Sequence, residues 1–302
     1  MRTYLKALFL SILVTQGVLV LRHSAGLSWA KGPGAAATAR RPYLILVPVV
    51  NTNPRRQRRL LKNLCGLEYP PREDVTVSFL ADAASMSILE RKGLEECGYM
   101  VETHLEAAGA RQAKDAAERH SLSVQMERRR MIAESRNTLL DSSLREWHEF
   151  AIWIDSDLGF IDPKTMRVLE LSGEAIAVPR CANADGRGAY DLNSFQETEE
   201  SLGVLRAMKK DEPVFEGYRD IGRLHMDDLA KEGAGLGLDY KVPLHGIGGT
   251  IIFTKTEIYR RGVRFATELV NGHYLETEGF AQVAINEGFN VVGLPNLVVT
   301  HA

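Results

Sequence analysis

The sequence predicts an α/β fold in which a Rossmann-like, mostly parallel sheet is flanked by helices. An unbroken apolar run at 43–50 (YLILVPVV) is typical of a central parallel strand that is covered on both faces. This run is followed by a second strand at 74–80, a helix at 85–97 and a third strand at 99–104. Strands that alternate with helices at this spacing form parallel, right-handed units.

The first helix of the domain is expected at 55–64. Asn53 and Pro54 precede it, and asparagine is a preferred helix cap while proline suits the first turn. Neither of the glycine-rich phosphate motifs, GxGxxG and GxxxxGK[ST], follows the first strand. Their absence from this position argues against a dinucleotide-binding or P-loop enzyme.

Composition and charge narrow the class of protein. With 302 residues, 45% hydrophobic and 25% charged, the chain suits one large α/β domain or two small ones. A net charge of −2 does not indicate the strongly basic character that is typical of nucleic-acid-binding proteins. The cysteines Cys65, Cys97 and Cys181 are too few and too scattered for a disulfide framework or a zinc site. At most one disulfide is expected, and a free buried thiol is the default for each.

The N-terminus differs from the rest of the chain. Arg2 and Lys6 precede a mostly apolar run, which we expect to be an uncleaved signal anchor. A signal peptide that is cleaved near residues 24–26 is the alternative. A linker rich in Gly, Ala and Ser follows. The expected organisation is a cytoplasmic tail (1–6), a signal anchor (7–21), a flexible stem (22–41) and a folded domain (42–302).

Two acids mark the end of a central strand. The apolar run 151–154 is followed by Asp155 and Asp157, and strand alternation places both acids on one side. Two carboxylates this close repel each other unless a cation lies between them, and Mg²⁺ or Mn²⁺ accepts such ligands. Acids also cap helices after strands, but the strongly apolar strand favours a metal site.

The second half of the domain should continue the same sheet. Asp162 and Pro163 begin a helix, and a strand is expected at 174–179. Residues 199–237 are charged and poorly patterned, so we expect a mobile insertion there. Further expected elements are a glycine-rich segment at 242–250, a strand at 251–254, a helix beginning near 275, and a strand at 290–294 whose apolar continuation delivers His301.

Several side chains are candidates to meet a ligand near the acids. On the predicted helix 110–145, Arg129 and Arg136 fall on nearly one face, and one of them can reach a diphosphate bound at the strand end. A solvated helix face is the alternative. The polar segment 190–197 is expected over the carboxyl edge of the sheet, where open α/β folds bind substrates. Glycines before the 251–254 strand allow a close backbone approach to a ligand, unless they form an ordinary turn.

Taken together, these segments resemble the fungal mannan-polymerase α-mannosyltransferases of the Golgi, the Anp/Van/Mnn-like glycosyltransferase family 62. The resemblance covers about residues 44–301. The segments that carry it are 133–137 (AESRN), 153–157 (WIDSD), 190–197 (YDLNSFQE), 242–250 (VPLHGIGGT), 275–281 (LETEGFA) and 293–296 (GLPN), with His301.

The resemblance implies a GT-A glycosyltransferase fold and a Mn²⁺-dependent, retaining transfer of mannose from GDP-mannose to a mannoside or glycan acceptor. It also implies a single-pass type II protein of the Golgi or ER membrane that works in a glycosyltransferase complex with a lumenal catalytic domain. The roles carried over are metal binding by Asp155, Asp157 and His301; donor binding by Arg136, Asn137, Asp155, Gly248 and Gly249; and acid roles near the reacting sugar and acceptor for Glu278 and Asp191.

The chain departs from the family pattern at two positions. His245 stands where the family usually has an acid, and the loop 49–52 lacks an expected acid. Acids in the first turn of a helix, such as Glu278, are also normal partners of the helix dipole. Two other functions stay open: a catalytically silent subunit of a transferase complex, and a GT-A enzyme that uses another nucleotide sugar.

Overall fold

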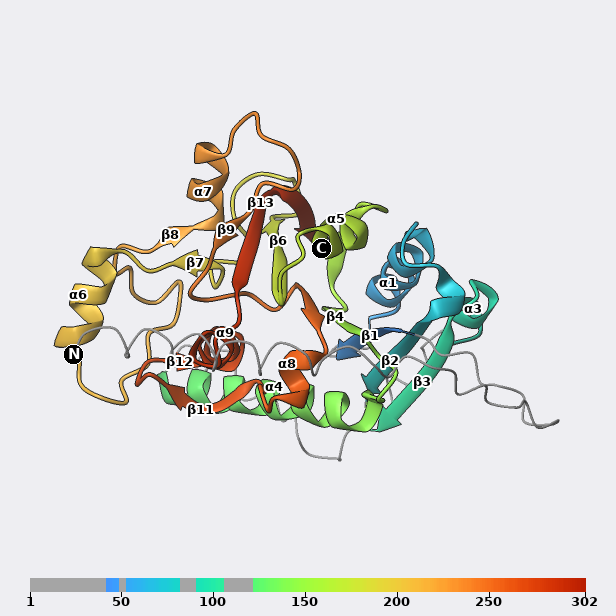
Figure 1. Cartoon of the computed structure of the whole chain (residues 1–302), viewed down its shortest axis with the longest axis horizontal. Helices are drawn as coiled ribbons and strands as arrows, with labels where there is room; N and C mark the ends of the chain where they lie inside the picture. Colours follow the sequence, from blue (N-terminus) through green and yellow to red (C-terminus); the bar gives the residue numbers. More distant parts are fainter. Residues whose placement is uncertain (1–41, 49–52, 82–90, 106–121) are drawn as a thin grey trace, which may run out of the picture. The chain divides into compact units, whose positions relative to one another are not determined.

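The computed structural model describes residues 42–48, 53–81, 91–105 and 122–302 (Figure 1). The predicted tail, anchor and stem lie outside these residues, as do the loop 49–52 and parts of the helices predicted at 85–97 and 110–145. Within the described ranges, no helix combines the length and the apolar character that crossing a membrane requires.

A nine-stranded sheet forms the centre of the described fold. Its strand order is β3-β2-β1-β4-β10-β6-β13-β5, and β9 pairs with β13. The strands are β1 (Tyr43–Pro48), β2 (Val75–Ala81), β3 (Met100–Leu105), β4 (Phe150–Ile154), β5 (Leu158–Phe160), β6 (Ile176–Ala182), β9 (Val242–Pro243), β10 (Ile251–Lys255) and β13 (Val291–His301).

The sheet is mixed, with as many antiparallel as parallel pairings among the described strands, rather than mostly parallel as predicted. The predicted parallel half is confirmed, because β1 pairs in parallel with both β2 and β4, and β2 with β3. β10 instead runs antiparallel between β4 and β6, and β13 then pairs in parallel with β6. An apolar run suits a covered strand in either direction, so the sequence pattern did not reveal this reversal.

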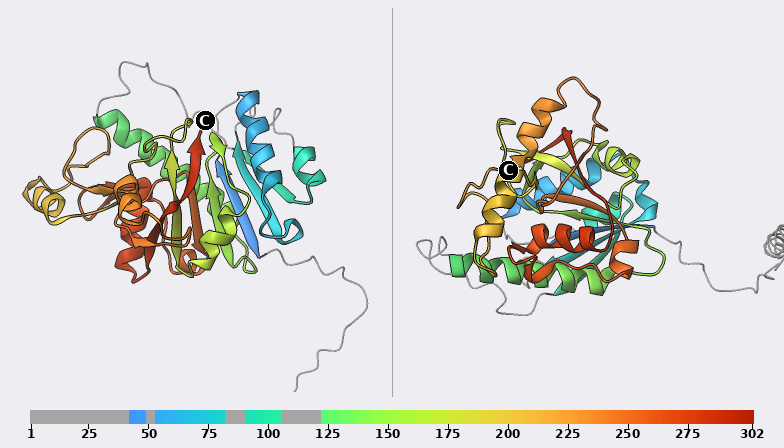
Figure 2. Two further views of the ribbon diagram at one scale, coloured as in Figure 1. Left: turned by 90° about the horizontal axis from the view of Figure 1, so that it is seen from above. Right: turned by 60° about the vertical axis from the view of Figure 1, so that its left-hand side comes forward.

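Helices cover both faces of the sheet (Figure 2). Alternate residues of β1 explain why its apolar run is unbroken: Ile45 packs under α1, α3 and α5, whereas Leu44 packs under α4, α8 and α9. The predicted start of α1 is confirmed, since the Asn53 side chain accepts a hydrogen bond from the Arg55 N–H at 3.0 Å. The helices are α1 (Pro54–Gly66), α3 (Arg91–Glu96), α4 (Leu122–Ser143), α5 (Thr165–Leu171), α8 (Glu257–Arg260) and α9 (Glu276–Asn286), with a 3-10 turn at Arg72–Asp74.

The charged segment 199–237 is folded, in contrast to the expected mobile insertion. It has its own small apolar cluster, and Thr198 and Ser201 form a capping box at the start of α6. Arg223 is buried between the carboxylates of Glu197 and Glu216, so charges that look solvent-exposed in the sequence are internal ion pairs. The elements here are β7 (Phe195–Gln196), α6 (Glu199–Ala207), β8 (Leu224–His225) and α7 (Met226–Glu232), and β11 (Ala266–Val270) and β12 (Tyr274–Leu275) form a separate ribbon.

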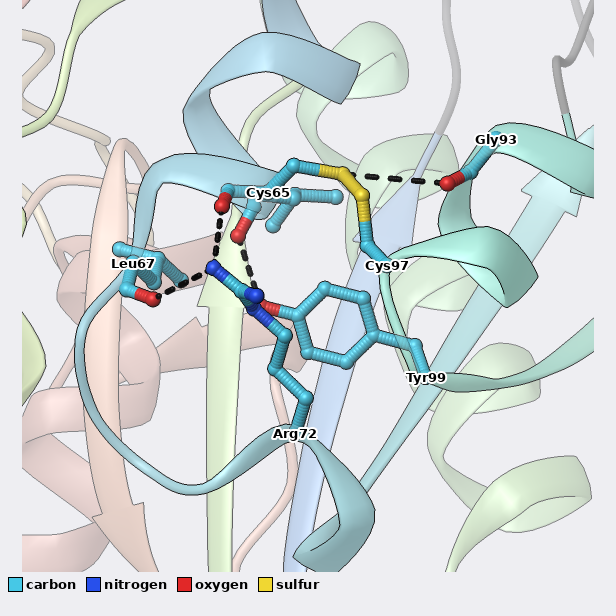
Figure 3. Close-up of a disulfide and its surroundings, with 7 residues drawn as sticks. Cys65, Leu67, Arg72, Gly93, Cys97 and Tyr99 are labelled. Atoms are coloured by element: carbon cyan, nitrogen blue, oxygen red, sulfur yellow. Dashed lines mark hydrogen bonds between the residues drawn. A yellow bond between two sulfur atoms is a disulfide. The ribbon is translucent and has the colours of Figure 1, made fainter.

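A disulfide joins Cys65, in the last turn of α1, to Cys97, just after α3 (Figure 3). The default expectation of a free thiol is therefore wrong for these two cysteines and confirmed for Cys181, which is free and buried. Beside the bridge, the Arg72 guanidinium donates to the carbonyls of Cys65 and Leu67. The bridge thus ties the two helices together on one face of the parallel half.

Removing this bridge with Cys65→Ser and Cys97→Ser should lower the free energy of unfolding by about 2–4 kcal/mol, because the bridge closes a long loop of the unfolded chain. Denaturant unfolding with and without reductant measures the effect. Reductant should destabilise the wild type and leave the double variant unchanged, and Cys181 serves as an internal control because both proteins keep it. Two additional thiols that react in the folded, unreduced protein would contradict the pairing.

Candidate active site

The candidate residues gather at one edge of the sheet because of its strand directions. β4 and β13 both end at this edge, since two antiparallel pairings through β10 restore the direction of β4 in β6 and β13. β10 begins there for the same reason. The Asp155 N–H donates to the Thr250 carbonyl at 3.0 Å, which joins the acidic turn after β4 to the glycine-rich segment before β10.

Asp157 and His301 meet, although 144 residues separate them in the chain. Their Oδ2 and Nε2 atoms lie 3.1 Å apart. The contact lacks hydrogen-bond geometry, and buried Nε2 has no hydrogen-bond partner among the described residues. Two neighbours fix the arrangement: the Tyr190 ring stacks on His301 at a centroid distance of 3.6 Å, and the Ala302 N–H donates to the Asp157 carbonyl at 3.0 Å.

Asp155 faces the predicted phosphate-binding arginine. The Arg136 Nη2 lies 3.1 Å from the Asp155 Oδ1, and Arg136 is buried beside the rings of Trp153 and Phe265. Burial raises the pKa of Asp155 to about 7, with Arg136 opposing the rise and Asp157 adding to it. Nε and Nη1 of Arg136 have no hydrogen-bond partner within the described residues. The guanidinium therefore has two donors left for an anion.

The chemistry of the Asp157–His301 pair fits a divalent cation. An oxygen and a nitrogen that each bond to one metal ion at about 2.1 Å lie roughly 3 Å apart, which is the spacing seen here. A buried imidazole nitrogen without a hydrogen bond is also what a metal ligand looks like before its ion binds. The described residues contain no group of three or more His, Cys, Asp or Glu side chains already arranged around a common metal position.

Asp191 and Glu278, the acids expected near the reacting sugar and acceptor, are linked through the side chains of two other residues. The Asn193 backbone and side-chain amides donate to the Asp191 Oδ1 at 2.9 and 3.1 Å. The Asn193 Oδ1 accepts from the Arg129 Nη2 at 3.2 Å, and the Arg129 Nη1 donates to the Glu278 Oε1 at 3.0 Å. Asp191 and Glu278 thus lie at the two ends of one hydrogen-bonded chain.

Glu278 occupies a different environment from that expected of a group touching substrate. Its side chain is 0% exposed, and burial raises its pKa to about 7 while Arg129 and Arg223 oppose the rise. Burial likewise raises the pKa of Asp191, against the effect of its hydrogen bonds from Asn193. Glu278 is thus a buried counter-charge for Arg129.

The glycines at 248 and 249 make room for side chains of the site itself. A Cβ added at Gly248 would lie 1.3 Å from the Asp191 Oδ2, and one at Gly249 would lie 2.3 Å from the Arg136 Nη2. An ordinary turn would tolerate a larger residue, but neither of these positions does. The two glycines therefore let Asp191 and Arg136 approach the segment before β10.

Asn137 and His245 have backbone partners. Both polar atoms of the Asn137 amide bond to Phe265, with its side chain donating to the Phe265 carbonyl at 2.9 Å and accepting from its N–H at 3.0 Å. The His245 Nδ1 accepts from the Glu197 N–H at 3.1 Å. Asn137 thus anchors α4 to the residue just before β11. His245, at a position where the family pattern has an acid, supports the segment 190–197.

Sequence reasoning gave no role to several residues that the structure brings to this edge. Asn193 and Tyr190 lie in the polar segment already expected there, but their contacts depend on tertiary structure. Arg56 lies in the first turn of α1, and its Nη1 is 3.6 Å from the Asp157 Oδ2. The sequence could have indicated this position, because Arg56 follows soon after β1 and therefore lies near the carboxyl edge of the sheet.

Comparison with known proteins identifies the family. The Anp1 family model matches residues 25–268. Three similar curated proteins are the mannan polymerase complex subunit mnn9 of Schizosaccharomyces pombe (28% identity over 85% of this chain and 79% of the relative), the mannan polymerase II complex anp1 subunit of the same yeast (31%, 64% and 46%), and the mannan polymerase I complex VAN1 subunit of Saccharomyces cerevisiae (29%, 61% and 35%).

One similar solved structure is the mannosyltransferase PcManGT from Pyrobaculum calidifontis in complex with GDP-Man and Mn²⁺, with 15% identity and a TM-score of 0.48 over 88% of this chain and 58% of that one. The family model spans well over half of the chain. The resemblance to the fungal mannan-polymerase family is thereby confirmed, and the chain belongs to the Anp1 family.

Proposed function

We propose that this chain is a metal-dependent, retaining α-mannosyltransferase with a GT-A fold, which transfers mannose from GDP-mannose to a mannoside or glycan acceptor. The observation that carries the proposal is the contact between Asp157 and His301. Asp157 lies near the middle of the domain sequence and His301 at its end, and their paired oxygen and nitrogen suit Mn²⁺. The mixed α/β sheet with acids at its carboxyl edge supports the GT-A assignment.

In this proposal Asp155, Asp157 and His301 hold Mn²⁺. The bound ion would neutralise the negative charge that develops on the leaving diphosphate. Arg136 binds the same diphosphate through its unpaired Nε and Nη1, which donate charge-assisted hydrogen bonds to different phosphate oxygens. Asp191, held by Asn193 and facing the glycine segment, binds hydroxyl groups of the sugar or acceptor.

The proposed setting is the Golgi or ER membrane. Residues 7–21 would anchor the protein with its catalytic domain in the lumen, and the Cys65–Cys97 disulfide suits that oxidising compartment. Three relatives carry names that describe them as subunits of mannan polymerase complexes, which supports partner subunits for this chain as well.

Thermal unfolding of the full-length protein with GDP or UDP, each with and without Mn²⁺, tests the donor and the metal together. GDP with Mn²⁺ should raise the Tm, because a ligand at 100 times its Kd stabilises the native state by about 2.7 kcal/mol. UDP, or GDP without Mn²⁺, should give a much smaller rise. In parallel, GDP-mannose with mannobiose and Mn²⁺ should release GDP.

The outcomes separate the alternative functions. A rise in Tm with UDP alone would indicate another nucleotide sugar. Binding of GDP without transfer to any of several α-mannoside acceptors, or no binding of either nucleotide, would indicate a catalytically silent subunit.

His301→Ala should reduce Mn²⁺-dependent transfer as severely as Asp157→Ala. We expect a loss of at least about 100-fold, since losing only an outer partner of a metal ligand typically costs 10–100-fold. The Tm without ligand should change little. His104→Ala is the matched control, because it removes a histidine from β3, at the other side of the sheet from β13, and should leave transfer unchanged. Wild-type activity of His301→Ala would refute the metal role of His301.

Gly248→Ala should displace Asp191, because the new Cβ would overlap its carboxylate. We expect transfer to fall by about 10- to 100-fold, in line with the misplacement of a catalytic group. Gly203→Ala is the control: Gly203 lies in α6 with no atom within 4 Å of an added Cβ, so activity should stay at the wild-type level. Equal activity of the two variants would show that Asp191 is not needed in its observed position.

A further inference from the structure

Glu276, the first residue of α9, has an unusual backbone conformation. Its φ is +55°, and within the described chain only Asp211 and Asn271 share a positive φ among non-glycine residues. Aspartate and asparagine tolerate this region because their short side chains bond to the local backbone, whereas glutamate gains no such help. A glutamate stays in this conformation only where its surroundings impose it.

The packing of α9 against β11 imposes the conformation. Glu276 forms an isolated antiparallel bridge with Ala266, the first residue of β11. Gly279, one turn further along α9, lies so close to the same strand that an added Cβ would be 2.4 Å from the Ala266 Cβ. The first turn of the helix therefore has no freedom to relax the backbone at residue 276.

The Glu276 side chain is largely buried, yet its carboxylate still reaches solvent. The residue is 9% exposed, and no hydrogen bond or ion pair of its carboxylate occurs within the ranges the structure describes. Its charge, after the larger effect of burial, contributes to the raised pKa of both Asp155 and Asp191, so it lies close to the site. A ligand with hydroxyl groups would donate hydrogen bonds to this carboxylate, which accepts none from the described residues.

The neighbouring acid on the same helix has the opposite character. Glu278 is 0% exposed and its Oε1 is bonded to Arg129 at 3.0 Å. The helix dipole explains an exposed acid in a first turn, but it requires neither burial nor a positive φ. Burial and backbone conformation therefore give the two acids different roles.

We propose that Glu276 contacts the sugar that is transferred, accepting hydrogen bonds from its hydroxyl groups, and that Glu278 positions Arg129 without touching substrate. The proposal rests on the proposed function, because it assigns a further substrate-contacting residue to the same site. A fixed carboxylate beside the sugar also favours the positive charge that develops at its anomeric carbon.

Three variants of the full-length protein test this assignment. Glu276→Gln should lower kcat/KM for GDP-mannose by about 100-fold or more. It should leave the Tm rise given by GDP with Mn²⁺ unchanged, because GDP lacks the sugar. Glu276→Gly should also lose activity, but it should raise the Tm of the ligand-free protein, since glycine adopts a positive φ without strain. Glu278→Gln should lower that Tm, because it leaves the buried Arg129 without its counter-charge.

Near-wild-type kcat/KM of Glu276→Gln, or a loss of GDP binding equal to its loss of transfer, would overturn the assignment. So would a fall in Tm for Glu276→Gly, since the residue would then be held for stability. Failure of the proposed function is distinguishable: the wild type would neither bind GDP nor release it from GDP-mannose. In that case the ligand-free Tm of Glu276→Gly still decides whether the strained glutamate is retained at a cost to stability.

Discussion

The antiparallel pairing of β4 with β10 is the constraint on which the candidate site depends. Ile154 pairs with Ile251, so the acidic turn after β4 lies opposite the glycine segment before β10. Because β10 is also antiparallel to β6, and β6 is parallel to β13, both β6 and β13 run in the same direction as β4. The end of β13 therefore lies beside Asp157. With β10 parallel to its neighbours, the glycines would lie at the other edge of the sheet.

Charge at this edge is balanced by two arginines of α4. Arg136 faces Asp155, and Arg129 faces Glu278, with both guanidinium groups buried. Buried ion pairs add little net stability, but breaking one is costly because it leaves a charge without a partner. The pairs therefore hold α4 in one position relative to the sheet.

The sequence predicted what depends on local pattern. The parallel half of the sheet, the start of α1 and the acids after β4 follow from apolar runs, caps and chain order, and an apolar run also pointed to His301. The direction of β10 did not follow, because an apolar run is the same in a parallel and in an antiparallel strand. The different environments of Glu276 and Glu278 did not follow either, because they depend on one φ angle and on burial between elements distant in the chain. The disulfide and the buried Arg223 pairs likewise depend on tertiary approach.

Close contact between Gly248 and Asp191 has a consequence for how such sequences change over time. A side chain at 248 and a carboxylate at 191 cannot occupy the same space, so the two positions are not free to vary independently. A lineage that gave up the aspartate would release the glycine, and any larger residue fixed there would then block the aspartate from returning. Loss of this acid would therefore be difficult to reverse.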